Sequence, residues 1–190
     1  MVAGDKNSIK GDVNNIIGSI NAVKGMSNNI LGTGNSLLGS QNNLIGSYNI
    51  GIGEMNSIIG DANMWMGNNN LIAGKSNLIS GNLNTILGDR SAVSGSSNKI
   101  NGTQNAVKGD NNLVNGNSNI VLQGSNNTIK GQNNQITGGT NFVLGSGNNI
   151  IGGSNNLSGL NNRVGGTANA IRGNSNFVQG SNNIVASSPE

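Results

Sequence analysis

The sequence predicts an all-β protein, a parallel two-sheet β-solenoid in which coils of 14 residues stack along one axis. Glycine recurs every seven residues from Gly4 to Gly116 and, after one longer unit, onward to Gly180. Asparagine stands three places after nearly every one of these glycines, and an aliphatic residue stands two places after the asparagine. Since 26 such units fill residues 5–187, we expect one solenoid domain over residues 1–190.

The stretch GDNNLVNG, which begins at Gly109, shows why the unit predicts a strand and a corner. Residues two apart in an extended chain point to the same side, so Asn112 and Val114 face inward together. Leu113 and Asn115 then face outward. The glycine and the two small polar residues after it supply the corner, because glycine tolerates the positive φ of tight turns.

Stacking follows because a seven-residue unit cannot bury its apolar side alone. Two units back to back make one coil, and stacked coils bury one continuous core. Strands of successive coils pair in parallel about 4.8 Å apart, so 13 coils extend roughly 60 Å. Identical asparagine amides then stack into ladders that satisfy their buried polar groups. We expect two inward columns, Ile16, Ile30, Leu44 and Ile58 on one sheet and Ile9, Val23, Leu37, Gly51, Trp65 and Ile79 on the other.

Three departures from the unit are informative. Gly51 occupies an inward aliphatic position one coil before Trp65, so we expect the indole to be buried over the glycine. An aromatic ligand site, or a flipped pair of strands that carries Trp65 to the surface, is the alternative. Ser91 replaces one ladder asparagine. The unit 117–124 has eight residues, and we expect a bulge to accommodate the extra one.

Composition excludes several classes of function. There is no His and no Cys, and the seven acidic residues all fall outside the inward and outward strand positions, so neither catalysis nor a metal site is expected. We also expect no cofactor, because no helix follows the glycine pairs as a phosphate loop requires. Two Phe, one Trp and one Tyr do not make a nucleic-acid stacking platform. No apolar run approaches 18 residues and no signal peptide is apparent, so the chain is expected to be soluble and not membrane-bound.

The outward positions of residues 29–94 carry no charge, and the charged residues of this stretch fall in corners. Such a surface favours an interface over bare protein surface. The first of the two outward sets is a candidate face for ice or a partner, Asn15, Ile17, Asn29, Leu31, Asn43, Ile45, Ser57, Ile59, Thr85 and Leu87. The second is a candidate protein-contact face, Leu38, Ile50, Ile52, Met64, Met66 and Leu78.

The heptad x-x-N-x-V-x-G resembles the repeat of plant ice recrystallization inhibition proteins, the ryegrass antifreeze type. The units SNNTIKG (125–131), DNNLVNG (110–116) and SNNIVAS (181–187) match it closely. The resemblance implies a left-handed roll with internal asparagine ladders, a secreted location, and adsorption to ice through one flat face. Family faces carry Thr, Ser and Val, whereas outward Thr is sporadic here, as at Thr85, Thr128 and Thr137.

Two functions therefore stay open. The first is ice binding, with ice or ordered water as the partner. The second is a structural, self-assembling module in which the aliphatic faces of residues 29–94 join copies of the chain into a dimer or filament. Short segments flank the repeats, Met1–Gly4 and Ala186–Glu190, and solenoids commonly need larger polar caps to prevent stacking.

Overall fold

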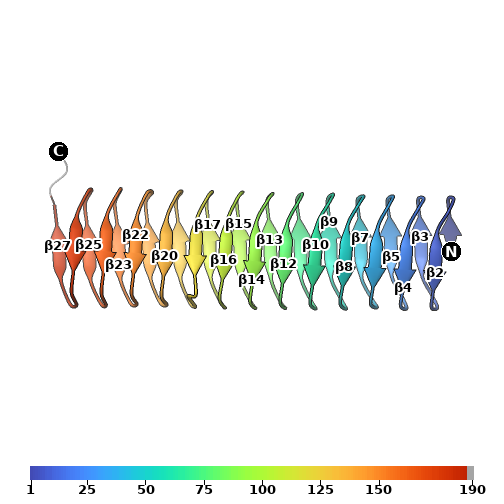
Figure 1. Ribbon diagram of the computed structural model, residues 1–190, viewed down its shortest axis with the longest axis horizontal. Helices are drawn as coiled ribbons and strands as arrows, with labels where there is room; N and C mark the ends of the chain where they lie inside the picture. The colour runs from blue at the N-terminus through green and yellow to red at the C-terminus, as the bar shows by residue number, and fades with distance from the viewer. Residues whose placement is uncertain (188–190) are drawn as a thin grey trace. The chain divides into compact units, whose positions relative to one another are not determined.

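The computed structural model describes residues 1–187, and it consists of short strands joined by corners (Figure 1). These residues form no helix, and therefore no membrane-spanning helix. The described chain has 27 strands, and at two strands per coil they make about 13 coils. The chain divides into two compact units, Met1–Val93, called unit 1, and the residues from Ser94 onward, called unit 2.

In each unit the odd-numbered strands form one parallel sheet and the even-numbered strands form a second. The odd strands of unit 1 are β1 (Val2–Ala3), β3 (Asn15–Ile17), β5 (Asn29–Leu31), β7 (Asn43–Ile45), β9 (Ser57–Ile59), β11 (Leu71–Ala73) and β13 (Thr85–Leu87). The even strands are β2 (Ser8–Lys10), β4 (Ala22–Lys24), β6 (Ser36–Leu38), β8 (Ile50–Ile52), β10 (Met64–Met66) and β12 (Leu78–Ser80), and β14 (Ala92–Ser94) spans the boundary.

Unit 2 repeats the arrangement. Its odd strands are β15 (Lys99–Asn101), β17 (Leu113–Asn115), β19 (Thr128–Lys130), β21 (Phe142–Leu144), β23 (Asn156–Ser158), β25 (Ala170–Arg172) and β27 (Ile184–Ala186). Its even strands are β16 (Ala106–Lys108), β18 (Ile120–Leu122), β20 (Gln135–Thr137), β22 (Asn149–Ile151), β24 (Arg163–Gly165) and β26 (Phe177–Gln179).

The pairing register confirms the 14-residue coil. Ile16 of β3 pairs with Ile30 of β5, and Trp65 of β10 pairs with Ile79 of β12. In almost every strand the middle residue is buried and its two neighbours face solvent, as the alternation of a strand requires. The two predicted inward columns are therefore confirmed, with Ile9 of the first coil half-buried.

Asparagine ladders run along the inside of both units. Asn56 Nδ2 donates to Asn42 Oδ1 at 3.0 Å and to the carbonyl oxygen of Gly67 at 2.9 Å. Its backbone N–H also donates to Asn42 Oδ1, at 3.0 Å. One buried amide thus joins its own coil to the two neighbouring coils and satisfies a corner carbonyl. At the Ser91 position the backbone continues the ladder, because the Ser91 backbone N–H donates to Asn77 Oδ1 at 2.9 Å.

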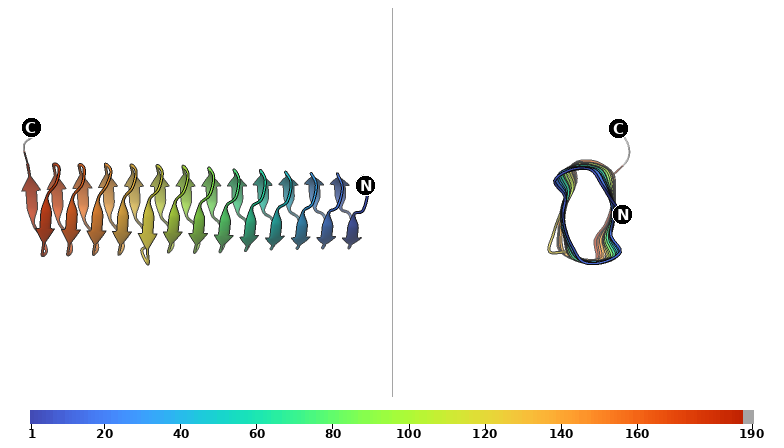
Figure 2. Two further views of the ribbon diagram at one scale, coloured as in Figure 1. Left: turned by 45° about the horizontal axis from the view of Figure 1, so that its top comes forward. Right: turned by 90° about the vertical axis from the view of Figure 1, so that its right-hand side faces the viewer.

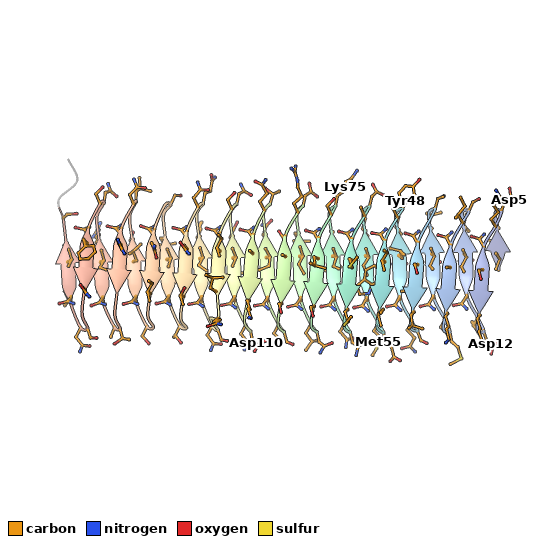
Figure 3. All side chains as sticks on the ribbon, in the orientation of Figure 1. Asp5, Asp12, Tyr48, Met55, Lys75 and Asp110 are labelled. Carbon is orange, nitrogen blue, oxygen red and sulfur yellow. The ribbon has the colours of Figure 1, made fainter. Side chains whose placement is uncertain are left out.

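The corners need two residues in the left-handed region, where the sequence indicated one. Gly60 has a φ of 133°, and a Cβ there would clash with the backbone carbonyl of Gly74. The second residue after nearly every corner glycine also has a φ near 57°, as at Ala62. The labelled side chains Tyr48 and Met55 occupy this second position and project outward from the corners (Figure 3).

The prediction for Trp65 is confirmed. Trp65 is 1% exposed, and its indole fills the space that a side chain at Gly51 would need. The ladder bonds of Asn49 and Asn63 are intact, which excludes the flipped strand pair. Among the buried side-chain nitrogen and oxygen atoms of residues 1–187, Trp65 Nε1 lacks a hydrogen-bond partner.

The extra residue of the unit 117–124 lies in a corner, so the expected bulge does not distort the strand. β18 keeps three residues. Its partners in β20 lie 15 residues later in the sequence instead of 14, so that Ile120 stands opposite Gln135. Gln123 follows the strand with a φ of 50°, and this corner projects past its neighbours, in yellow in Figure 2. A corner absorbs the insertion because its carbonyls and N–H groups reach water more easily than those of a paired strand.

Candidate functional site

The candidate ice face lies on the odd-numbered strands of unit 1, and its residues point outward as predicted. The second outward position of these strands forms an aliphatic column, Ile17, Leu31, Ile45, Ile59 and Leu87, whose members are 39–49% exposed. Ala73 of β11 is a small residue within this column. The column carries no charge over its length in unit 1.

The first outward position of the same strands carries a second asparagine ladder, on the solvent side. Asn15 Nδ2 donates to Asn29 Oδ1, and Asn29 Nδ2 donates to Asn43 Oδ1, each at 3.0 Å. Ser57 and Thr85 continue the position with hydroxyl groups, and Leu71 interrupts it. Sequence reasoning noted these asparagines but not the bonds between them, because the 14-residue spacing aligns the side chains without fixing their conformation.

The two columns together form a regular array. Neighbouring coils repeat about every 4.8 Å, and the two outward positions of a strand lie roughly 6.6 Å apart. The outer ladder holds the asparagine side chains in a repeated conformation, so their polar atoms recur at the coil spacing. A fixed amide column beside an aliphatic column can order a layer of water without charged groups.

The even-numbered strands of unit 1 present the candidate protein-contact face. Six large apolar side chains stand outward on four consecutive strands, and they are 44–59% exposed, Leu38, Ile50, Ile52, Met64, Met66 and Leu78. Lys10 and Lys24 stand on the first strands of this sheet. Beside them, a shallow trough of about 490 Å³ extends to Ile52. This face is bulkier and less regular than the odd face.

Charged residues in the middle of unit 1 lie in corners, where they leave both faces neutral. Lys75 Nζ contacts Asp61 Oδ2 at 3.1 Å, and Asp61 Oδ1 accepts a 2.9 Å bond from the backbone N–H of Ser47. The Ser47 N–H and then the Lys75 ammonium hold the pKa of Asp61 below its ordinary value. Other corners use the same bond, as where Asn68 Oδ1 accepts from the N–H of Glu54 at 2.8 Å.

This bond explains why Ser, Asp or Asn so often follows the corner glycine, which sequence reasoning assigned only to turn preference. In unit 2 the backbone N–H of Leu160 donates to Asn174 Oδ1 at 2.9 Å in the same way. Within residues 1–187 no group of three His, Cys, Asp or Glu side chains converges as a metal site would need.

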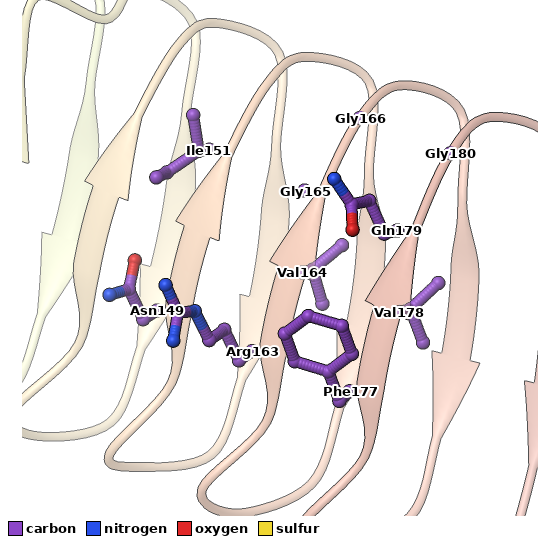
Figure 4. A pocket seen from close by; sticks show the side chains of 10 residues that line it. All are labelled: Asn149, Ile151, Arg163, Val164, Gly165, Gly166, Phe177, Val178, Gln179 and Gly180. Carbon is purple, nitrogen blue, oxygen red and sulfur yellow. The ribbon is translucent and has the colours of Figure 1, made fainter.

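The faces of unit 2 are charged. Lys99, Lys130 and Arg172 stand outward on odd strands, and Lys108 and Arg163 stand outward on even strands. On the even strands a trough of about 520 Å³ lies beside Arg163 and Phe177 (Figure 4). The guanidinium carbon of Arg163 lies 5.8 Å from the centroid of the Phe177 ring.

The family described as the grass antifreeze beta roll matches residues 100–190. The match covers almost all of unit 2, and the same repeat, register and ladder are present in unit 1. Comparison with curated proteins finds no match for the chain.

Proposed function

We propose that this protein binds ice and inhibits ice recrystallization, because the model of the grass antifreeze beta-roll family, an ice-binding family, matches its residues 100–190. The conclusion depends on one observation above the others. Over successive coils of unit 1, the odd-numbered face repeats an uncharged pair of outward side chains, and 3.0 Å amide bonds join the polar members Asn15, Asn29 and Asn43.

An uncharged, repeated face suits ice better than the other surfaces of the chain. A charged side chain holds its own hydration shell, whereas an aliphatic group leaves the neighbouring waters hydrogen-bonded mainly to one another. Amides at a fixed repeat then anchor that layer. The described faces of unit 2 carry cations such as Lys130 and Arg172, so we place the ice face in unit 1.

Placing a single charge on each face of unit 1 tests this assignment. Ile45→Lys puts an ammonium group into the aliphatic column of the odd face, and we expect it to abolish inhibition of recrystallization. Met64→Lys is the matched control, because it puts the same group on the even face at a similarly exposed position. The readout is ice-grain growth in an annealed frozen solution.

Circular dichroism shows whether each variant is folded, since both positions are exposed and should tolerate lysine. Activity that survives Ile45→Lys in a folded protein contradicts the assignment of the face. Parent protein that leaves grain growth unchanged contradicts ice binding itself.

Self-association is a second candidate function, favoured by the even face of unit 1. Four consecutive strands there expose large apolar side chains, a patch that marks interaction sites more often than bare surface. Flexible Met64 and Met66 adapt to a second copy more readily than to a lattice. We expect sedimentation velocity to show a dimer in the parent protein and a monomer for Met64→Lys. A monomeric parent protein contradicts this candidate.

A further inference from the structure

The trough on the even-numbered face of unit 2 has the features of a ligand site. Its volume of about 520 Å³ is within the range of small-molecule pockets. Three consecutive strands, β22, β24 and β26, line it. One side carries Asn149, Arg163 and Phe177, and the other carries Ile151 and Gln179 (Figure 4).

Gly165 forms the floor of this trough, and the fold does not require glycine there. Its φ is not positive, unlike that of the corner glycine Gly166, which has a φ of 122°. A Cβ at Gly165 would meet nothing within 4 Å. Glycine inside a strand costs about 0.5–1 kcal/mol relative to alanine and often marks close approach of a ligand to the backbone. The absent side chain opens the gap between Ile151 and Gln179.

Charge and aromatic surface meet at the same place. Arg163 is exposed, and Phe177 is 69% exposed, so the guanidinium and the ring are both open to solvent. Residues 94–187 contain five basic residues and one acidic residue, whereas residues 1–93 contain five of each. The trough therefore lies in the positively charged part of the sequence, and its own cation is Arg163.

We propose that this trough binds a carboxylated sugar ring, as found in oligosaccharides of uronic acids. The guanidinium of Arg163 offers two parallel N–H donors, which match the two oxygens of a carboxylate. The apolar C–H face of a pyranose ring packs against Phe177 above the open floor at Gly165. The amides of Asn149 and Gln179 both donate and accept, as sugar hydroxyls require.

Isothermal titration calorimetry of the full chain with a trimer of galacturonic acid tests the proposal. The fully methyl-esterified trimer keeps the rings and loses the charge, and inorganic sulfate keeps a charge and lacks the rings. We expect the acid trimer to bind, and esterification or Arg163→Gln to weaken it by roughly tenfold or more, because the charge-assisted hydrogen bonds are lost. Sulfate should fail to displace the trimer at equal concentration.

Gly165→Val closes the trough from its floor and should abolish binding while the protein stays folded. Arg172→Gln and Ser158→Val, on neighbouring odd strands of the same unit, are the matched controls and should bind like the parent protein. No heat with the acid trimer, displacement by sulfate at equal concentration, or full binding by folded Gly165→Val would each overturn the proposal. Ice activity is measured separately, so its presence or absence decides nothing here.

Discussion

In unit 1 the left-handed corner position often carries a large side chain, whereas in unit 2 it carries small or polar ones. Val13, Ile20 and Tyr48 take this conformation in unit 1, with φ values of 58°, 62° and 59°. In unit 2 the position is filled mostly by Ser, Asn, Gln and Thr, as at Asn133. β-branched residues are uncommon at positive φ, so the corners of unit 1 carry more backbone strain.

The outward strand positions differ as well. From Asn29 to Val93 the charges of unit 1 lie in corners and its faces are neutral, whereas unit 2 carries Lys99, Lys130 and Arg163 on its strands. The inward columns and ladders are nevertheless built in the same way. Inward positions therefore fix the fold, and outward positions are free to give each unit its own surface chemistry.

Removing a ladder amide should have the largest effect, and an equal one in both units. Asn42→Ala in unit 1 leaves the backbone N–H of Asn56 and the carbonyl of Gly53 without their ladder bonds, and Asn148→Ala does the same in unit 2 to Asn162 and Gly159. We expect each to lower the free energy of unfolding by roughly 2–6 kcal/mol, because two buried polar groups at about 1–3 kcal/mol each lose partners. Urea unfolding measures it.

The outer ladder provides the control for this prediction. Asn29→Ala removes an exposed amide of the same kind, and it should change the free energy of unfolding by no more than about 0.5 kcal/mol. If Asn148→Ala also changes the free energy of unfolding this little while Asn42→Ala lowers it strongly, the inner ladder does not stabilise the two units equally.

The same glycine substitution should have opposite effects in the two units. Gly51→Val in unit 1 forces a side chain into the buried indole of Trp65 and should cost about 1–3 kcal/mol. Gly165→Val in unit 2 enters open space on a strand, and it should leave stability unchanged or raise it by up to about 1 kcal/mol. Thermal unfolding of the two variants compares them.

A second substitution identifies the cause. Trp65→Val should recover much of the stability lost in Gly51→Val, because two valines suit a column built from Val, Ile and Leu. A double variant no more stable than Gly51→Val alone would show that the indole is not the obstacle.

The sequence predicted the sheets, the coil length and the inward columns because each follows from a strict period. It placed Trp65 over Gly51 because the two occupy one column, and a core sized for Val has no other room for an indole. It placed Ile45 and Met64 outward because of their positions within the seven-residue repeat. The function of those faces depends on how they order water or contact a partner, and the position of a residue within the repeat does not reveal this.

The corners could not be read in the same way. Val13, Ala62 and Asn133 all occupy the left-handed position, so residue type does not reveal it. The eight-residue unit showed that one residue was extra but not where it would lie. The spacing of the glycines gives the length of a unit and does not show at which residue its strand ends. The outer bonds between Asn15 and Asn29 depend on side-chain conformation, which spacing alone leaves open.

Relieving corner strain should stabilise unit 1 by a smaller amount. Ile20→Asn replaces a β-branched residue at a φ of 62° with one that tolerates this conformation, and we expect a gain of about 1 kcal/mol. The reverse change in unit 2, Asn133→Ile, should cost a similar amount at a φ of 56°. Urea unfolding measures both, and a loss on Ile20→Asn would show that the isoleucine makes a compensating contact.

The smallest effect concerns the corner carboxylate of unit 1. The Ser47 N–H and then the Lys75 ammonium lower the pKa of Asp61, so its contribution to stability is present above the unfolded pKa and is lost as pH falls through the folded value. Since Asp61 is 43% exposed, solvent screens the pair and the change should be slight. Lys75→Gln should move the acid loss of stability to higher pH, toward the ordinary aspartate range. Asp61→Asn keeps the acceptor for Ser47 and should remove this part of the pH dependence altogether. Urea midpoints between pH 2 and pH 7 follow both variants. Identical curves for Lys75→Gln and the parent would show that the Lys75 ammonium does not lower the pKa of Asp61.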